Sequence, residues 1–139
     1  MPIREATHED IDRVLALWLD GTSVVSHTDD PEGMRILLDR DPGALLLSED
    51  EGGRLLGTLI AAWDGWRASM YRLVVAPEAR RGGIASALVR HSEERFRSVG
   101  ARRVAANVIF EHPHAVGFWE AMGYRHESSM GRFVKMLQE

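Results

Sequence analysis

Apolar residues recur along this chain with two different periods, and the two periods predict different secondary structures. A spacing of three to four residues, typical of amphipathic helices, predicts helices over residues 7–21, 30–41, 83–100 and 114–122. Short apolar runs between polar turns predict strands over residues 3–6, 44–48, 55–63, 70–75, 104–109, 124–128 and 133–137. The expected order is β-α-α-β-β-β-α-β-α-β-β, with an antiparallel meander followed by a parallel crossover.

The junction between the fourth expected strand and the third expected helix has the features of a phosphate-binding site. Gly82 and Gly83 let the backbone approach a ligand closely, because they carry no Cβ. The first turn of a helix offers N–H groups without intrahelical partners, at the positive end of the helix dipole. Arg80 and Arg81 stand beside that turn. We call residues 80–86 the cradle and expect it to bind a pyrophosphate.

Composition limits the class of protein. With 139 residues, of which 45% are hydrophobic, the chain has the length of one compact domain, and we expect a single domain over residues 1–139. The sequence has no apolar run of about 18 residues and no signal-peptide pattern, which predicts a soluble cytoplasmic protein with no membrane partner. The absence of cysteine excludes disulfide bonds, thiolate zinc sites and a cysteine nucleophile.

The net charge of −4 hides an asymmetry between the two halves of the chain. Residues 1–70 carry 6 basic and 14 acidic side chains, whereas residues 71–139 carry 11 and 7. A basic half that contains the cradle would suit an enzyme that joins a polyanionic cofactor to a cationic amine. A merely solvated surface would explain the acidic half equally well. Because basic residues concentrate only at the cradle, nucleic-acid binding is not expected.

The cradle matches neither of two common nucleotide-binding signatures, Gly-x-Gly-x-x-Gly and the Walker loop. Its pattern, Arg80-x-x-Gly83-x-Ala85, resembles the coenzyme A pyrophosphate loop of the GCN5-related N-acetyltransferase (GNAT) family, and the order of elements is similar over essentially the whole chain. The resemblance implies an α/β fold with a mixed, mostly antiparallel sheet. Its central strands would splay apart to admit acetyl-CoA as co-substrate.

The resemblance also implies which residues bind the cofactor. They are Leu73, Val74, Val75, Arg80, Arg81, Gly82, Gly83, Ile84, Ala85, Ser86, Asn107 and His112. The backbone of the first three would pair with the pantetheine arm, although the same apolar pattern would arise if their side chains were only core. Asn107 could bond to the cofactor or substrate, or it could satisfy a neighbouring backbone group at the opening of the sheet.

A second block, residues 115–124, is similar to the family's segment Asn-x-x-Ala-x-x-Phe-Tyr-Glu-x-x-Gly-Phe/Tyr. It departs from that segment at two positions. His112 stands where the family commonly has asparagine, and Trp119 stands where it commonly has the tyrosine that protonates the departing thiolate. An indole N–H donates a hydrogen bond but does not usefully release its proton. Another group therefore serves as acid, or the thiolate is only hydrogen-bonded, or the activity is altered.

Attack of an amine on a thioester needs a neutral amine, a stabilised oxyanion and release of the thiolate. The resemblance implies that a backbone N–H near Val75 stabilises the oxyanion. The strand that ends there carries no carboxylate to act as base. Water would then carry the proton to solvent through a relay, and the candidate relays are Asp64, Tyr71, Glu111 and His112.

Two local patterns have both a functional and a structural interpretation. His112 and His114 have the His-x-His spacing of metal ligands, but a structural zinc site needs further ligands and the intervening proline suits a helix start, so no metal is expected. The turn 63–67 could form an acceptor pocket from two tryptophans and Asp64. Its Asp-Gly pair is equally a tight-turn signal. Trp18 lies on the apolar face of the first helix and is expected in the core.

These observations predict an N-acetyltransferase that moves an acetyl group from acetyl-CoA directly to a primary amine, without a covalent intermediate on the enzyme. The acceptor would be a small molecule or a peptide. An alternative is a catalytically weak acyl-CoA-binding regulatory module with the same fold, in which the cradle remains but the chemistry is lost. A homodimer is plausible because closing strands in this fold often pair across subunits.

Overall fold

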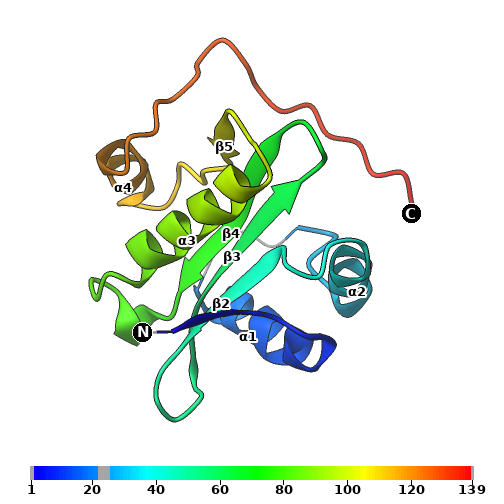
Figure 1. Cartoon of the computed structure of the whole chain (residues 1–139), viewed down its shortest axis with the longest axis vertical. Coiled ribbons are helices and arrows are strands. Elements are labelled where there is room, and N and C mark those ends of the chain that lie inside the picture. The colour runs from blue at the N-terminus through cyan, green and yellow to red at the C-terminus, as the bar shows by residue number, and fades with distance from the viewer. Residues whose placement is uncertain (1, 22–25, 139) are drawn as a thin grey trace. The chain divides into compact units, whose positions relative to one another are not determined.

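A computed structural model describes residues 2–21 and 26–138, and the chain divides into two compact units, Met1–Asn107 and Val108–Glu139. The elements of the first unit are β1 (Ile3–Glu5), the 3₁₀ turn η1 (His8–Asp10), α1 (Ile11–Gly21), α2 (Pro31–Arg40), β2 (Leu45–Glu49), β3 (Leu55–Trp63), β4 (Ala68–Val75), the 3₁₀ turn η2 (Pro77–Ala79), α3 (Ile84–Ser98) and β5 (Val104–Ala106) (Figure 1). The second unit contains α4 (Ala115–Ala121).

The strands of the first unit form one sheet in the order β1-β2-β3-β4-β5. Neighbours pair antiparallel from β1 to β4, whereas β4 and β5 pair parallel across the α3 crossover, so the predicted meander and crossover are confirmed. The β4–β5 ladder covers only Ala68, Ser69 and Met70 on β4. The rest of β4 runs on beyond that ladder in the described part of the chain, which is the expected splay.

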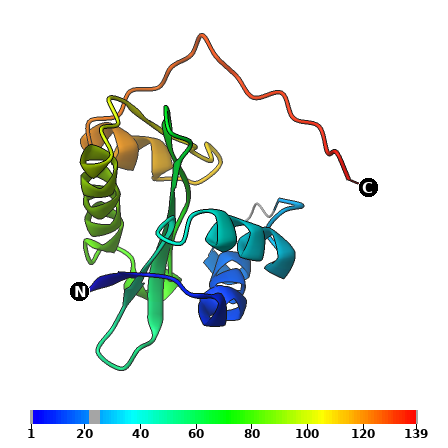
Figure 2. The same ribbon diagram turned by 45° about the vertical axis from the view of Figure 1, so that its right-hand side comes forward.

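Helices cover both faces of this sheet, with α1 and α2 on one face and α3 on the other (Figures 1 and 2). On β2, Leu45 and Leu47 belong to the hydrophobic cluster that also contains Trp18, so the predicted core position of Trp18 is confirmed. On the other face, a Cβ at Gly57 would lie 2.9 Å from the side chain of Ile84 and 3.2 Å from that of Leu88. The glycine therefore lets α3 pack directly on β3.

Both N-terminal helices begin at the residues that the sequence indicates. The Asp30 carboxylate accepts a hydrogen bond from the Gly33 N–H at 2.7 Å, and Pro31 occupies the first turn of α2. Thr7 is the N-cap of η1, which continues directly into α1. The first turn of the expected helix is thus a 3₁₀ turn, the tighter form that is frequent at helix ends.

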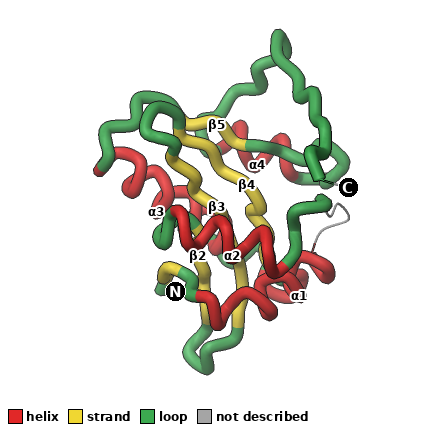
Figure 3. Tube along the Cα trace, turned by 90° about the vertical axis from the view of Figure 1, so that its right-hand side faces the viewer, coloured by secondary structure: helices red, strands yellow, loops and turns green. Residues whose placement is uncertain are grey.

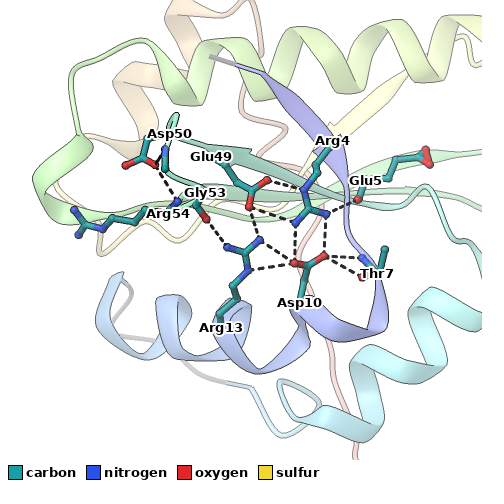
Figure 4. Close-up of polar contacts among 10 residues, drawn as sticks. Arg4, Glu5, Thr7, Asp10, Arg13, Glu49, Asp50, Gly53 and Arg54 are labelled. Carbon is teal, nitrogen blue, oxygen red and sulfur yellow. Dashed lines mark hydrogen bonds and ion pairs between the residues drawn. The ribbon is translucent and has the colours of Figure 1, made fainter.

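A cluster of polar side chains ties β1, η1, α1 and β2 together (Figure 4). Asp10 is buried and accepts from the guanidinium groups of Arg4 and Arg13 at 2.8 Å each, and from the Thr7 N–H at 2.8 Å. Arg4 also donates to Glu49 at 2.6 Å. Hydrogen bonds from Arg4 hold the pKa of the Asp10 carboxyl, and that of Glu49, below their ordinary values.

The C-terminal part of the sequence-based prediction is wrong. Residues 124–138 form no strand in the described chain, and Figure 3 draws this segment as loop throughout. Phe133 and Leu137, which were expected to belong to a closing strand, are fully or almost fully exposed. Without burial of these side chains, nothing offsets the conformational entropy that an ordered strand would lose.

Among the described helices of the whole chain, none combines the length and apolar character needed to cross a membrane.

Candidate functional site: an open helix N-terminus beside a bulged strand

The cradle lies where the chain leaves β4 and enters α3. Gly83 is the N-cap of α3 with φ 81° and ψ 7°, and it supplies no side-chain cap. The first intrahelical hydrogen bond runs from the Ala87 N–H to the Gly83 carbonyl at 3.0 Å. The N–H groups of Ile84, Ala85 and Ser86 therefore have no partner within the helix, at the positive end of a 15-residue dipole.

The backbone just before α3 alternates between left-handed and other conformations, and this alternation turns successive N–H groups toward one side. Arg81 has φ 71° and Gly83 has φ 81°, so two residues in this short loop adopt the left-handed region. Such an alternation forms a concave nest of N–H groups that suits an anion. A Cβ placed at Gly83 would meet nothing within 4 Å, so the space above the helix start is open. The donors of the cradle therefore suit a negatively charged group.

The two arginines of the cradle have different surroundings. The Arg80 guanidinium donates to the carbonyls of Val75 at 3.3 Å and of Gly21 at 3.1 Å, and so fixes the end of β4 to the end of α1. Arg81 is exposed. A nearby ion pair, Arg54 with Glu78, adds no net charge to this region.

Strand β4 contains a bulge at Arg72 and Leu73, shortly before the strand ends at Val75. Thr58 pairs with Val74 and Ile60 pairs with Tyr71, so one more residue lies on β4 than on β3 between these pairs. Arg72, inside the bulge, has φ 55°, which is strained for a residue with a side chain. Such a bulge re-aims backbone groups that a regular ladder would use.

Buried side chains hold the bulge from the α1 face. The Trp18 indole N–H donates to Thr58 Oγ1 at 2.8 Å, and the Thr58 hydroxyl donates to the Arg72 carbonyl at 3.1 Å. The Arg72 guanidinium lies 5.8 Å from the Trp18 ring and forms two contacts with the Asp29 carboxylate, at 2.5 and 3.1 Å. The apolar pattern of the first helix predicted Trp18 in the core, but neither the bulge nor its partners have a sequence signature that would predict this network.

Two other candidate residues of the first unit, Asn107 and Asp64, have structural partners. Both the backbone and side-chain nitrogens of Asn107 donate to the Met70 carbonyl, at 3.0 and 3.2 Å, as in the structural interpretation of this residue. Asp64 accepts from the N–H groups of Arg67 and Trp66, which lower the pKa of its carboxyl and close the hairpin turn. Tyr71 is exposed on β4.

The second unit holds the remaining candidates. The His112 carbonyl accepts from the Ala115 N–H at 3.2 Å in the turn before α4. Trp119 makes edge-to-face contacts with Phe118 and Tyr124, with ring centroids 5.3 and 5.0 Å apart. Glu111 is exposed. The described residues of the whole chain contain no group of three or more His, Asp or Glu side chains arranged to hold a metal ion.

The structure thus brings the cofactor candidates of residues 73–75 and 80–86 together in the first unit, at one end of β4. Asp64 lies at the hairpin that precedes β4, whereas the cradle follows its other end. Glu111, His112 and Trp119 belong to the second unit. A basic, open helix start beside a bulged strand can hold a polyanion and present backbone N–H groups to it.

Comparison with known protein families gives a match over most of the chain. The sequence model of the "Acetyltransferase (GNAT) family" matches residues 11–124. That span includes the first helix, the meander, the cradle, the crossover and α4.

Solved structures with the same fold include three that differ in source. The aminoglycoside antibiotic 6'-N-acetyltransferase AAC(6')-IG from Acinetobacter haemolyticus is 19% identical, with a TM-score of 0.77 over 99% of this chain and 100% of that one. Ard1 from Thermoplasma volcanium is 20% identical, with a TM-score of 0.78 over 88% of this chain and 80% of that one. Naa20 from Chaetomium thermophilum, in complex with a bisubstrate analogue, is 21% identical, with a TM-score of 0.75 over 88% and 70%.

Proposed function

The chain belongs to the acetyltransferase (GNAT) family, and from this premise we propose that it transfers the acetyl group of acetyl-CoA directly to a primary amine within a ternary complex. The observation that carries the proposal is the uncapped start of α3, where the N–H groups of residues 84–86 lack intrahelical partners. This start joins the loop 80–83, which has the family pattern. The proposed acceptor is an amine of a small molecule or a peptide.

In this proposal the cradle binds the pyrophosphate of the cofactor. Arg80 and Arg81 supply positive charge, and the backbone N–H groups of Gly82, Gly83 and the first turn of α3 supply hydrogen bonds. The backbone of residues 73–75 pairs with the pantetheine arm, because β4 continues there beyond its ladder with β5. Asn107 and His112 would complete the cofactor site.

Bound acetyl-CoA supplies a thioester that is already activated toward an amine. The protein has to position the acceptor and stabilise the negative charge that develops on the thioester oxygen. The bulge supports this role. The Arg72 carbonyl accepts from Thr58, and in a trans peptide the N–H of the next residue, Leu73, points the opposite way. We assign the stabilising N–H to Leu73.

Proton transfer needs little from the protein, and several groups could carry it. Asp64, Tyr71, Glu111 and His112 remain the candidate relays from the acceptor amine to solvent. Trp119, at the position of the family tyrosine, would donate a hydrogen bond to the departing thiolate without protonating it. The absence of cysteine is consistent with direct transfer and no acyl-enzyme step.

We propose one acetyltransferase domain over residues 1–139, since the family match spans parts of both compact units. A cytoplasmic location and a homodimer stay predictions. The homodimer was predicted because closing strands often pair across subunits, and the described residues do not form those strands.

A second candidate function is a catalytically weak acyl-CoA-binding module, and Trp119 is the observation that favours it. Release of free thiol from acetyl-CoA, followed across a panel of amino acids, polyamines, aminoglycosides and peptides, separates the two. Amine-dependent release supports the transferase and identifies the acceptor class. Binding of acetyl-CoA and desulfo-CoA, with no release of free thiol in the presence of any amine, supports the acyl-CoA-binding module.

A further inference from the structure

We infer that Thr58, oriented by Trp18, is a positioning residue for acetyl transfer: its hydroxyl fixes the peptide group between Arg72 and Leu73 so that the Leu73 N–H faces the thioester oxygen. The inference rests on the proposed function. Thr58 lies on β3 and Trp18 on α1, and neither belongs to the cradle or to the candidate relays. Figure 1 labels both elements.

The direction of the hydrogen bonds follows from the chemistry of the two side chains. An indole N–H is only a donor, so Thr58 Oγ1 has to accept from Trp18 at 2.8 Å. A hydroxyl has a single proton. The Thr58 proton is then directed to the Arg72 carbonyl at 3.1 Å. Trp18 is 1% exposed and Thr58 is 0% exposed, so water does not compete for either bond.

This hydrogen bond sets where the next N–H points. The C=O and N–H of one trans peptide group point in opposite directions. Since the Arg72 carbonyl points toward Thr58, the Leu73 N–H points away from it. Neither Arg72 nor Leu73 has a register partner on β3, and the pairing of β4 with β5 ends at Met70. The Leu73 N–H therefore points away from β3, on the edge of β4 that lies beyond its pairing with β5.

The bulge needs such a support, because Arg72 holds a left-handed φ of 55° that a residue with a side chain adopts only under constraint. Two constraints act on it. One is the Thr58 hydroxyl on the backbone carbonyl, and the other is the Asp29 carboxylate on the guanidinium. Only the first acts on the peptide group itself, so removal of the hydroxyl should disturb the direction of the Leu73 N–H most.

The test compares Thr58→Val, which removes the hydroxyl at constant shape, with Thr58→Ser, which keeps it. Ser92→Ala is the matched control, since Ser92 is also fully buried and donates to a backbone carbonyl, that of Leu88, at 3.0 Å. We expect Thr58→Val to lower kcat about tenfold or more, with the KM for acetyl-CoA within about twofold of wild type. Thr58→Ser and Ser92→Ala should keep kcat within about threefold.

A wild-type kcat in Thr58→Val would overturn the inference, and so would an equal fall in kcat in Ser92→Ala. A second readout does not depend on turnover: addition of acetyl-CoA should shift the Leu73 amide proton resonance in wild type and much less in Thr58→Val. If Thr58→Val does not fold, Trp18→Phe removes the indole donor and should reduce the same shift. A Leu73 resonance that does not respond in wild type refutes the inference, whereas a response without turnover refutes only the proposed function.

Discussion

Replacement of Asp10 by asparagine should destabilise the protein strongly, because Asp10 is the acceptor shared by most donors of its cluster (Figure 4). Its carboxylate accepts from Arg4, Arg13 and the Thr7 N–H. An asparagine at this position loses the charge and presents an NH₂ group to these donors. Loss of one partner from a buried ion pair costs about 3–5 kcal/mol.

The solvent exposure of Arg4 and Arg13 lowers this cost in free energy. The side chain of Asp10 is 8% exposed, but those of Arg4 and Arg13 are 41% and 34% exposed, so water solvates part of their charge when Asp10 is removed. We therefore expect a loss of about 2–3 kcal/mol in the free energy of unfolding at pH 7. For a domain of this size, that corresponds to a fall in Tm of about 6–12 °C.

The effect should depend on pH with a defined sign. Because the pKa of Asp10 is lowered by folding, its stabilisation is fully present above the ordinary carboxyl pKa and is lost as the pH falls toward the folded value. The gap between wild type and Asp10→Asn should thus be widest at neutral pH. Below about pH 4 it should narrow by up to about 1.4 kcal/mol per pH unit.

Urea unfolding followed by circular dichroism at pH 7 and pH 3 measures both effects. Asp39→Asn is the matched control, because Asp39 pairs with His8 at the surface with a side chain that is 71% exposed. We expect that control to change the free energy of unfolding by less than about 1 kcal/mol. An Asp10→Asn protein as stable as the control, or a gap that widens toward acid, would refute the reasoning.

Two further predictions concern the cradle and the candidate acid. Arg81→Glu should weaken acetyl-CoA binding about tenfold at low salt and less at high salt, because it reverses an exposed charge. The control Arg90→Glu, farther along α3, should have little effect. Equal losses of affinity in both variants, measured by calorimetry, would contradict the assignment of the cradle as the pyrophosphate site. Trp119→Tyr should raise kcat if thiolate protonation limits turnover, and an unchanged kcat in a thiol-release assay would show that it does not.

Local sequence signals predicted the first unit well. Asp30 and Pro31 set the start of α2, and the polar turn after β2 set the boundaries of β3, which match at both ends, Leu55 and Trp63. These features depend on neighbouring residues alone, through capping and turn chemistry. Strand β5 is shorter than expected, and it ends before Asn107, whose nitrogens both donate to the Met70 carbonyl.

The features that sequence analysis missed depend on partners far away in the chain. The bulge at Arg72 is held by Thr58, Trp18 and Asp29, which come from three other segments. No local pattern reports such contacts. The reverse error occurred at residues 133–137, where a short apolar run predicted a strand that has no pairing partner in the described chain. An apolar run shows that a segment could form a strand, but pairing decides whether it does.

A calorimetric titration with acetyl-CoA tests the central claim most directly, with Gly83→Leu and Gly100→Leu beside wild type. Both glycines have a positive φ, 81° and 82°, and a Cβ at either would meet nothing within 4 Å, so the two substitutions impose similar backbone strain at opposite ends of α3. We predict that wild type and Gly100→Leu bind acetyl-CoA, and that Gly83→Leu binds at least about tenfold more weakly. Absence of binding to wild type, or equal affinity in both variants, would contradict the assignment of the cradle.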